Sequence, residues 1–268
     1  PDDEMNNVPQ QLTKNITGLG YQIRFSRWNA NVFGKMYRLY SSTHKLMNQF
    51  TEEQKWEQLT SRKHRYGYGA AATYYILPSL QAKVSFEHAF RMPEAVEMFG
   101  DGMVQKSNPD LKPESSNNFN AGFLYDQNLG SHRLQAEVNY IYRDTKDFIL
   151  KGVSLTNNPT TSYDNIGNVH TRGIEAMLGY SYKRNLHVSG NLTFQDIKDK
   201  MRYEKSQNTY VGDGMNENIT YGQRLPNIPY FIMNGHADYN FLDFGKKGNS
   251  LSLNYDVQYI HDYYLSFT

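Results

Sequence analysis

The chain has 268 residues, of which 38% are hydrophobic and 14% aromatic, and its 28 basic residues nearly balance its 27 acidic ones. The aromatic content excludes a disordered chain, and no stretch approaches the ~18 apolar residues of a membrane-spanning helix. The charge is balanced and dispersed along the sequence, without the cluster of basic residues that is typical of a nucleic-acid-binding protein. The absence of cysteine excludes disulfide scaffolds and thiolate metal sites. These features leave an all-β protein whose thin apolar surface is bounded by aromatic residues.

The two ends of the sequence differ from those of a complete exported protein. Residues 1–4 are polar and acidic, without the basic and apolar regions of a signal peptide. Residues 265–268 stop within an aromatic run that resembles a strand. We therefore expect the sequence to be part of a longer protein.

Alternation of apolar and polar residues with a period of two runs through most of the chain. In 132–143, Leu134, Val138 and Tyr140 fall on one face and Arg133, Glu137 and Asn139 on the other. Residues two apart share a face only in a strand. The pattern predicts strands at 19–26, 30–42, 64–77, 80–87, 117–126, 132–143, 173–182, 186–195, 231–241 and 251–259. It does not define which face of 30–42 and 64–77 is apolar.

The connections between these segments alternate in length. Short turns lie near 27–29, 77–79, 128–130, 183–185 and 243–248, and long connections lie at 43–63, 91–115, 147–171 and 197–229. This order predicts an antiparallel up-and-down meander of about ten strands. Outer-membrane barrels combine short turns on one side with long loops on the other, and a strand of ~9–11 residues is long enough to cross a bilayer.

A soluble β-sandwich or β-helix is the structural alternative to a membrane barrel. Sandwich cores prefer Val, Ile and Leu, whereas the apolar face here is rich in Tyr and Ala. Tyrosine at strand ends suits the boundary between membrane and water, and loops longer than ~15 residues are uncommon in compact domains. The pattern therefore favours the barrel.

Two sequence boxes lie within residues 90–115. The first reads Phe-Arg-x-Pro-x-x-x-Glu-x-Phe-Gly from residue 90, and the second reads Asn-Pro-Asp-Leu-Lys-Pro-Glu-Ser from residue 108. In this order and between two strands, the pair resembles the boxes of TonB-dependent outer-membrane receptors. Residues 115–122 and 171–175 resemble the same family. The motif residues are Phe90, Arg91, Pro93, Glu97, Phe99, Gly100, Asn108, Pro109, Leu111, Pro113 and Glu114.

The residue types in the boxes indicate a structural role. Pro93, Pro109 and Pro113 fix φ and remove donors, which holds a long loop in one path. Arg91 and Glu114 are expected to pair at the base of the loop in a charge-assisted contact. We interpret the boxes as a brace for the loop, not as substrate contacts.

The resemblance implies a fold and a function. It implies part of a transmembrane barrel of about 22 strands, without the plug domain and without the closing C-terminal strand, in the outer membrane of a Gram-negative bacterium. It implies a transport receptor, not an enzyme, that has no cofactor and imports a scarce nutrient: a siderophore, cobalamin or a glycan. The implied partners are the receptor's own plug domain, TonB with its inner-membrane energising complex, outer-membrane lipid and the small-molecule or glycan substrate.

Alternation also predicts which polar residues face the lumen and the plug. Even-numbered residues of 132–143 are predicted to face lipid. The plug-facing candidates are Arg133, Gln135, Glu137, Asn139, Ser189, Asn191, Thr193, Asn254, Asp256 and Gln258.

The sequence gives little support to metal sites. The eight histidines are scattered without ligand spacing. Asp196, Asp199, Glu204 and Asp213 are candidates for a Ca²⁺ site, but they lack EF-hand spacing and are interpreted as solvated loop charges. The motif interval 94–107 contains Met98 and Met103 but no histidine, so we expect no haem bound through an axial histidine of this loop.

Two other functions remain compatible with the sequence. One is a non-transporting outer-membrane barrel for adhesion or assembly. The other is a soluble sugar-binding β protein, because the loops rich in Tyr and Asn suit sugar stacking. A plug domain preceding the barrel would distinguish a transporter from the adhesin or assembly barrel.

Overall fold

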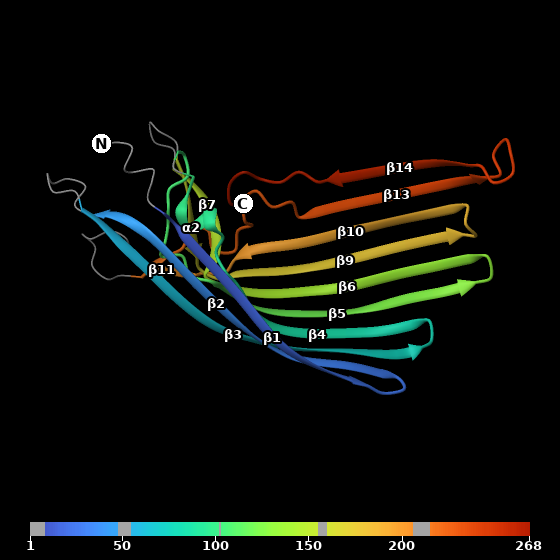
Figure 1. The fold of residues 1–268 in the computed structure, drawn as a ribbon, viewed down its shortest axis with the longest axis horizontal. Coiled ribbons are helices and arrows are strands. Elements are labelled where there is room, and N and C mark those ends of the chain that lie inside the picture. The colour runs from blue at the N-terminus through green and yellow to red at the C-terminus, as the bar shows by residue number, and fades with distance from the viewer. Residues whose placement is uncertain (1–8, 48–54, 102, 155–159, 206–214) are drawn as a thin grey trace.

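The computed structural model describes residues 9–47, 55–101, 103–154, 160–205 and 215–268. Ten strands form one antiparallel sheet in chain order, and all short turns lie at one end of it (Figure 1). The predicted all-β meander is therefore confirmed. The strands are β1 (Gln11–Arg24), β2 (Trp28–Met47), β3 (Lys55–Leu77), β4 (Leu80–Arg91), β5 (Glu114–Leu129), β6 (His132–Lys146), β9 (Val169–Tyr182), β10 (Leu186–Asp199), β13 (Phe231–Leu242) and β14 (Ser250–Ile260).

The long connections lie at the opposite end and carry small elements of their own (Figure 1). These are α2 (Ala95–Phe99) and the two-stranded pairs β7 (Phe148–Ser154) with β8 (Thr160–Ile166) and β11 (Tyr203–Lys205) with β12 (Met215–Glu217). The predicted loops 43–63, 147–171 and 197–229 are too long. β2 continues to Met47, β3 begins at Lys55, and β9 and β10 also extend past the predicted boundaries, because their backbones remain paired there.

The pairing register assigns every strand residue to one of two faces. Directly opposed residues of antiparallel strands share a face, and one continuous row across the sheet is apolar: Trp28, Tyr74, Ala82, Phe123, Val138, Ala176, Leu192, Met233 and Tyr259. The next row is mostly polar: Asn29, Thr73, Lys83, Gly122, Asn139, Glu175 and Thr193. We call the first side the outer face and the second the inner face.

Charged residues on the inner face satisfy one another across the sheet. Lys35 bonds Glu87 at 2.6 Å and Lys83 bonds Glu137 at 3.0 Å, each pair spanning an intervening strand. The inner face of β3 is closely packed at Gly69. A Cβ at Gly69 would lie 2.5 Å from the Phe33 ring and 2.7 Å from a backbone oxygen of β4, so only glycine fits there.

The polarity of β2 reverses near the long connections. Tyr37 and Leu39 point to the inner side, are 4% and 2% exposed, and pack with Met92, Met98, Leu111 and Ile149 in the main apolar cluster. Arg38 and Tyr40 lie on the outer face of the same stretch. This reversal is the reason why alternation left the apolar face of 30–42 undefined. The start of 64–77 has a basic residue on each face, His64 outside and Arg65 inside.

Residues 261–268 form no strand, although the aromatic run in which residues 265–268 stop resembles one in sequence. The backbone N–H of Asn227 bonds the Tyr264 carbonyl at 2.8 Å, which turns the segment back towards the long connection. Among the described strands, β1 and β14 are the two edges of the sheet. No helix in the described ranges has the length and apolar character needed to cross a membrane.

Candidate functional site

The motif loop is held at its base by one guanidinium group. Arg91, the last residue of β4, bonds both carboxylate oxygens of Glu97 at 3.0 and 3.1 Å and bonds Glu114 at 2.9 Å. Glu97 lies in α2, and Glu114 is the first residue of β5. The predicted Arg91–Glu114 pair is confirmed, and Glu97 is a second partner that joins the two boxes.

Both carboxylates also accept backbone hydrogen bonds. Glu97 accepts the N–H of Glu94 at 2.7 Å, and Glu114 accepts the N–H of Ile149 at 2.8 Å. Burial lowers the pKa of Arg91, but the hydrogen bonds and negative charge of Glu114 and Glu97 outweigh it and raise the pKa above its ordinary value. The base of the loop is therefore a closed, charge-assisted network.

The second box is tied to the β7–β8 hairpin. The Asn108 amide donates to the Tyr163 carbonyl at 2.9 Å and to Asp164 at 3.0 Å. Lys112 and Asn165 exchange two bonds of 2.8 and 3.0 Å. The loop and the hairpin therefore form one unit on the inner face.

The remaining motif residues complete this unit. Pro93 and Leu111 are fully buried, and Lys63 on β3 donates to the Leu111 carbonyl at 2.5 Å. Gly100 has a φ of 73°, in the region that favours glycine, and ends α2. Pro113 is buried, and the partly buried motif residues are Phe90, Phe99 and Pro109.

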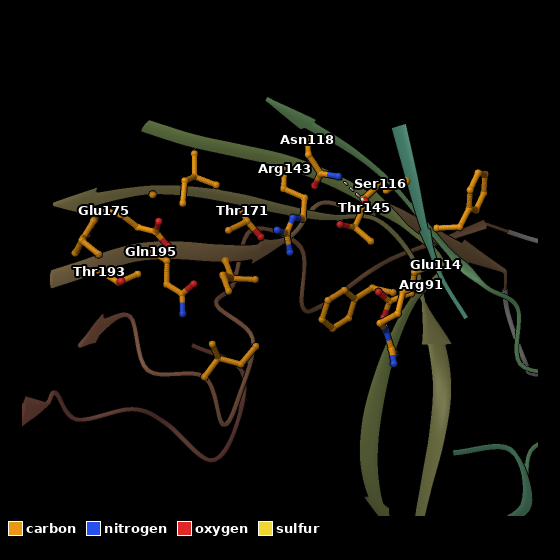
Figure 2. Close-up of a pocket in the computed structure, with 18 residues that line it drawn as sticks. Arg91, Glu114, Ser116, Asn118, Arg143, Thr145, Thr171, Glu175, Thr193 and Gln195 are labelled. Atoms are coloured by element: carbon orange, nitrogen blue, oxygen red, sulfur yellow. Dashed lines mark hydrogen bonds and ion pairs between the residues drawn. The ribbon is translucent and has the colours of Figure 1, made fainter. Parts of the chain in front are cut away.

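A cavity of about 580 Å³ lies on the inner face beside this network. Arg91 and Glu114 form one wall, and the inner faces of β5, β6, β9 and β10 form another (Figure 2). Its polar side chains include Asn118, Arg143, Glu175, Thr193 and Gln195. Of the predicted lumen residues, Thr193 lines this cavity.

Three polar groups in the cavity wall have unused bonding capacity. Arg143 and Glu175 line the cavity with no ion-pair partner in the part of the chain that the structure describes. The Oδ1 atom of Asn118 is buried and accepts no hydrogen bond from a described residue. Alternation placed Arg143 on the polar face, but no sequence pattern indicates that these three residues lie around one cavity. The cavity wall therefore offers its occupant a hydrogen-bond acceptor from Asn118, a cation from Arg143 and an anion from Glu175.

The register places all the predicted lumen residues on the inner face. Arg133 bonds Asp126 at 2.7 Å, Asn139 bonds Glu137 at 3.2 Å, and Gln258 reaches Asn191 through Asn234 with bonds of 3.0 Å. The remaining candidates share this face by their pairing: Gln135, Ser189, Thr193, Asn254 and Asp256. Their contact with a plug domain stays a prediction.

The interpretation of Asp196 and Asp199 as solvated loop charges is wrong. Both belong to β10: Asp196 bonds Arg224 at 2.8 Å, and Asp199 is 4% exposed and accepts bonds of 2.9 and 2.6 Å from Asn218 and Thr220. Asp199 therefore fixes the following loop. The Glu204 side chain and Asp213 lie outside the described residues. Within the described part, no three His, Asp or Glu side chains are arranged to hold a metal ion.

A sheet with an apolar outer face, a polar inner face and long connections at one end defines the wall of a transmembrane β-barrel. A family model described as TonB dependent receptor-like, beta-barrel, matches residues 7–266. The chain belongs to this family, whose members are transport receptors of the outer membrane and not enzymes. No curated protein matches the sequence.

Solved structures share the fold at low sequence identity. The ferric-catecholate import receptor Fiu from E. coli is 13% identical with a TM-score of 0.62, over 95% of this chain and 35% of that one. The ferric yersiniabactin uptake receptor FyuA from Yersinia pestis is 15% identical with a TM-score of 0.60, over 96% and 35%. The copper transporter OprC is 16% identical with a TM-score of 0.61, over 87% and 33%. The chain thus spans about a third of their length.

Glu114→Ala is expected to loosen the motif loop. Two bonds to a buried carboxylate disappear, which lowers the local free energy of opening by about 2–4 kcal/mol. Hydrogen exchange of the Ile149 amide in the full-length receptor measures this effect. Glu114→Gln keeps a hydrogen-bond acceptor for the Ile149 amide. In this variant the Ile149 amide should exchange at a rate between those of wild type and Glu114→Ala. Equal protection in Glu114→Ala and wild type would show that the network does not hold the loop.

Proposed function

We propose that the chain forms part of the barrel of an outer-membrane receptor that binds a scarce nutrient and imports it with energy supplied through TonB. The observation that carries the proposal is the polar inner face of a chain that belongs to the TonB-dependent receptor family. Such a face needs a hydrated or protein-filled lumen, because unpaired polar groups are costly in an apolar surrounding.

The cavity supports a plug domain as the occupant of the lumen. Asn118 offers an acceptor, Arg143 a cation and Glu175 an anion, and a folded polypeptide segment supplies complements for all three. The motif network lies beside the cavity and braces its wall. In this proposal the boxes position the barrel around the plug, and substrate binds to loops and plug at the outer end.

The substrate class is a ferric siderophore, cobalamin or a glycan. The titles of the similar structures name a ferric-catecholate receptor, a ferric yersiniabactin receptor and a copper transporter. These names support testing metal chelates first.

Uptake by the full-length receptor tests the proposal. The receptor would be expressed in a Gram-negative strain that lacks its own copy and offered labelled ferric siderophores, cobalamin or malto-oligosaccharides. Accumulation of one class, lost when TonB is absent, is the expected result. Binding without accumulation would favour the adhesion or assembly barrel. A receptor that stays out of the membrane would favour the soluble sugar-binding protein.

Haem is not expected to bind through the motif loop. Met98 is 0% exposed and cannot reach a ligand, and Met103, although 89% exposed, offers only a weak thioether. The pairing register turns His44, His64 and His170 to the outer face. Haemin titration of the full-length receptor should give no saturable Soret shift that depends on Met103. A tight shift abolished by Met103→Ala would contradict this expectation.

A further inference from the structure

Three basic residues lie together on the outer face of β2 and β3. Arg38 is directly opposite His64, and Arg62 is opposite Tyr40, two pairs further along the strands and on the same face. All three are exposed. Their side of the sheet is fixed because their neighbours Leu39 and Lys63 face inwards, against the motif loop. We call Arg38, Arg62 and His64 the rim cluster.

Among the described residues, none compensates the positive charge of the rim cluster. Facing residues on β1 are the neutral Asn15 and Thr13. Arg62 lies 5.6 Å from the centre of the Tyr40 ring, and neither Arg38 nor Arg62 has an ion-pair partner in the described ranges. Inner-face Lys35, by contrast, is paired with Glu87 at 2.6 Å. Two neighbouring guanidinium groups therefore keep their donors available.

The rim cluster lies at one end of the apolar band on the outer face. The outer face of β2 is free of charged residues from Trp28 to Met36, which at ~3.3 Å per residue is about 26 Å along the strand. This length matches the ~25 Å apolar band of outer-membrane barrels. The ring centres of Trp28 and Tyr74 lie 4.5 Å apart at one end of the band, and Tyr66, 68% exposed, lies at the other. The rim cluster follows directly after Tyr66, at the level of lipid head groups.

We propose that the rim cluster binds the phosphate groups of a lipid in the leaflet on the side of the long connections. The planar fork of arginine matches two phosphate oxygens at once. Two such forks stand at the edge of the apolar band, where acyl chains lie along the band and a phosphorylated head group meets the cations. The Tyr40 ring holds Arg62 in place. This inference rests on the membrane placement in the proposed function.

The test uses the full-length receptor in detergent micelles and bisphosphorylated lipid A as the probe. The variant is Arg38→Gln with Arg62→Gln. The matched control is Lys246→Gln with Lys247→Gln, which removes the same charge from an exposed turn at the opposite end of the sheet. Each cation near a membrane surface contributes about fivefold to binding. The rim variant should therefore bind about twenty-five-fold more weakly, and the control should be unchanged.

Two further binding measurements identify the source of the phosphate. Wild-type receptor should bind dephosphorylated lipid A as weakly as the rim variant binds the intact lipid, and millimolar inorganic phosphate should not displace the lipid. Equal binding of both lipids by wild type would overturn the inference even if the rim variant fails to fold. An equal loss in the lysine control, or displacement by free phosphate, would also overturn it. If the receptor inserts and transports but these binding measurements contradict the inference, the proposed function still stands.

Discussion

Val138→Arg is expected to lower the free energy of unfolding of the full-length receptor in lipid by about 2–4 kcal/mol. Val138 lies on the outer face in the middle of the apolar row, between Phe123 and Ala176, and is 45% exposed. An arginine there places a cation against hydrocarbon, with no carboxylate in its row. Denaturant titration of the receptor in vesicles measures the loss.

Asn139→Arg is the matched control for this prediction. Asn139 is the next residue and lies on the inner face, directly opposite Glu175 and within 3.2 Å of Glu137. A new arginine gains two carboxylate neighbours there, so the change in stability should stay within about 1 kcal/mol. Similar losses for both variants would contradict the assignment of the faces.

The 268-residue polypeptide, produced alone, is expected to associate with itself. β1 and β14 are the edges of the described sheet, and β14 is exposed along its whole length. Unpaired edges recruit other strands, and unpaired backbone groups are costly in lipid. Analytical ultracentrifugation in detergent should show dimers or larger species, and dilution should not give a cooperatively melting monomer.

The full-length receptor under the same conditions is the comparison. It should sediment as a single species, because a closed barrel has no free edge. A monodisperse monomer of the 268-residue polypeptide with a cooperative melt would show that its edges are satisfied in another way and that the open-sheet architecture is wrong.

Much of the sheet is determined locally and was therefore predictable. A strand places residues two apart on one face, so the alternation around Val138 and Asn139 specified both the strand and its two faces. Turn residues and connection lengths then specified the meander. The boxes predicted the Arg91–Glu114 pair, because prolines and opposite charges at both ends of a loop indicate a fixed base.

The path of the motif loop was decided only by the tertiary structure. Glu97 reaches Arg91 because α2 turns it back towards β4, and sequence spacing alone does not show this. Tyr37 and Leu39 are buried because the same loop packs on the inner face of β2, which reverses the local polarity and leaves Arg38 outside. Asp199 is buried for a similar reason, since Asn218 and Thr220 fold back to it from a distant part of the chain. Local alternation determines which residues share a face, but packing between distant segments determines which face is buried.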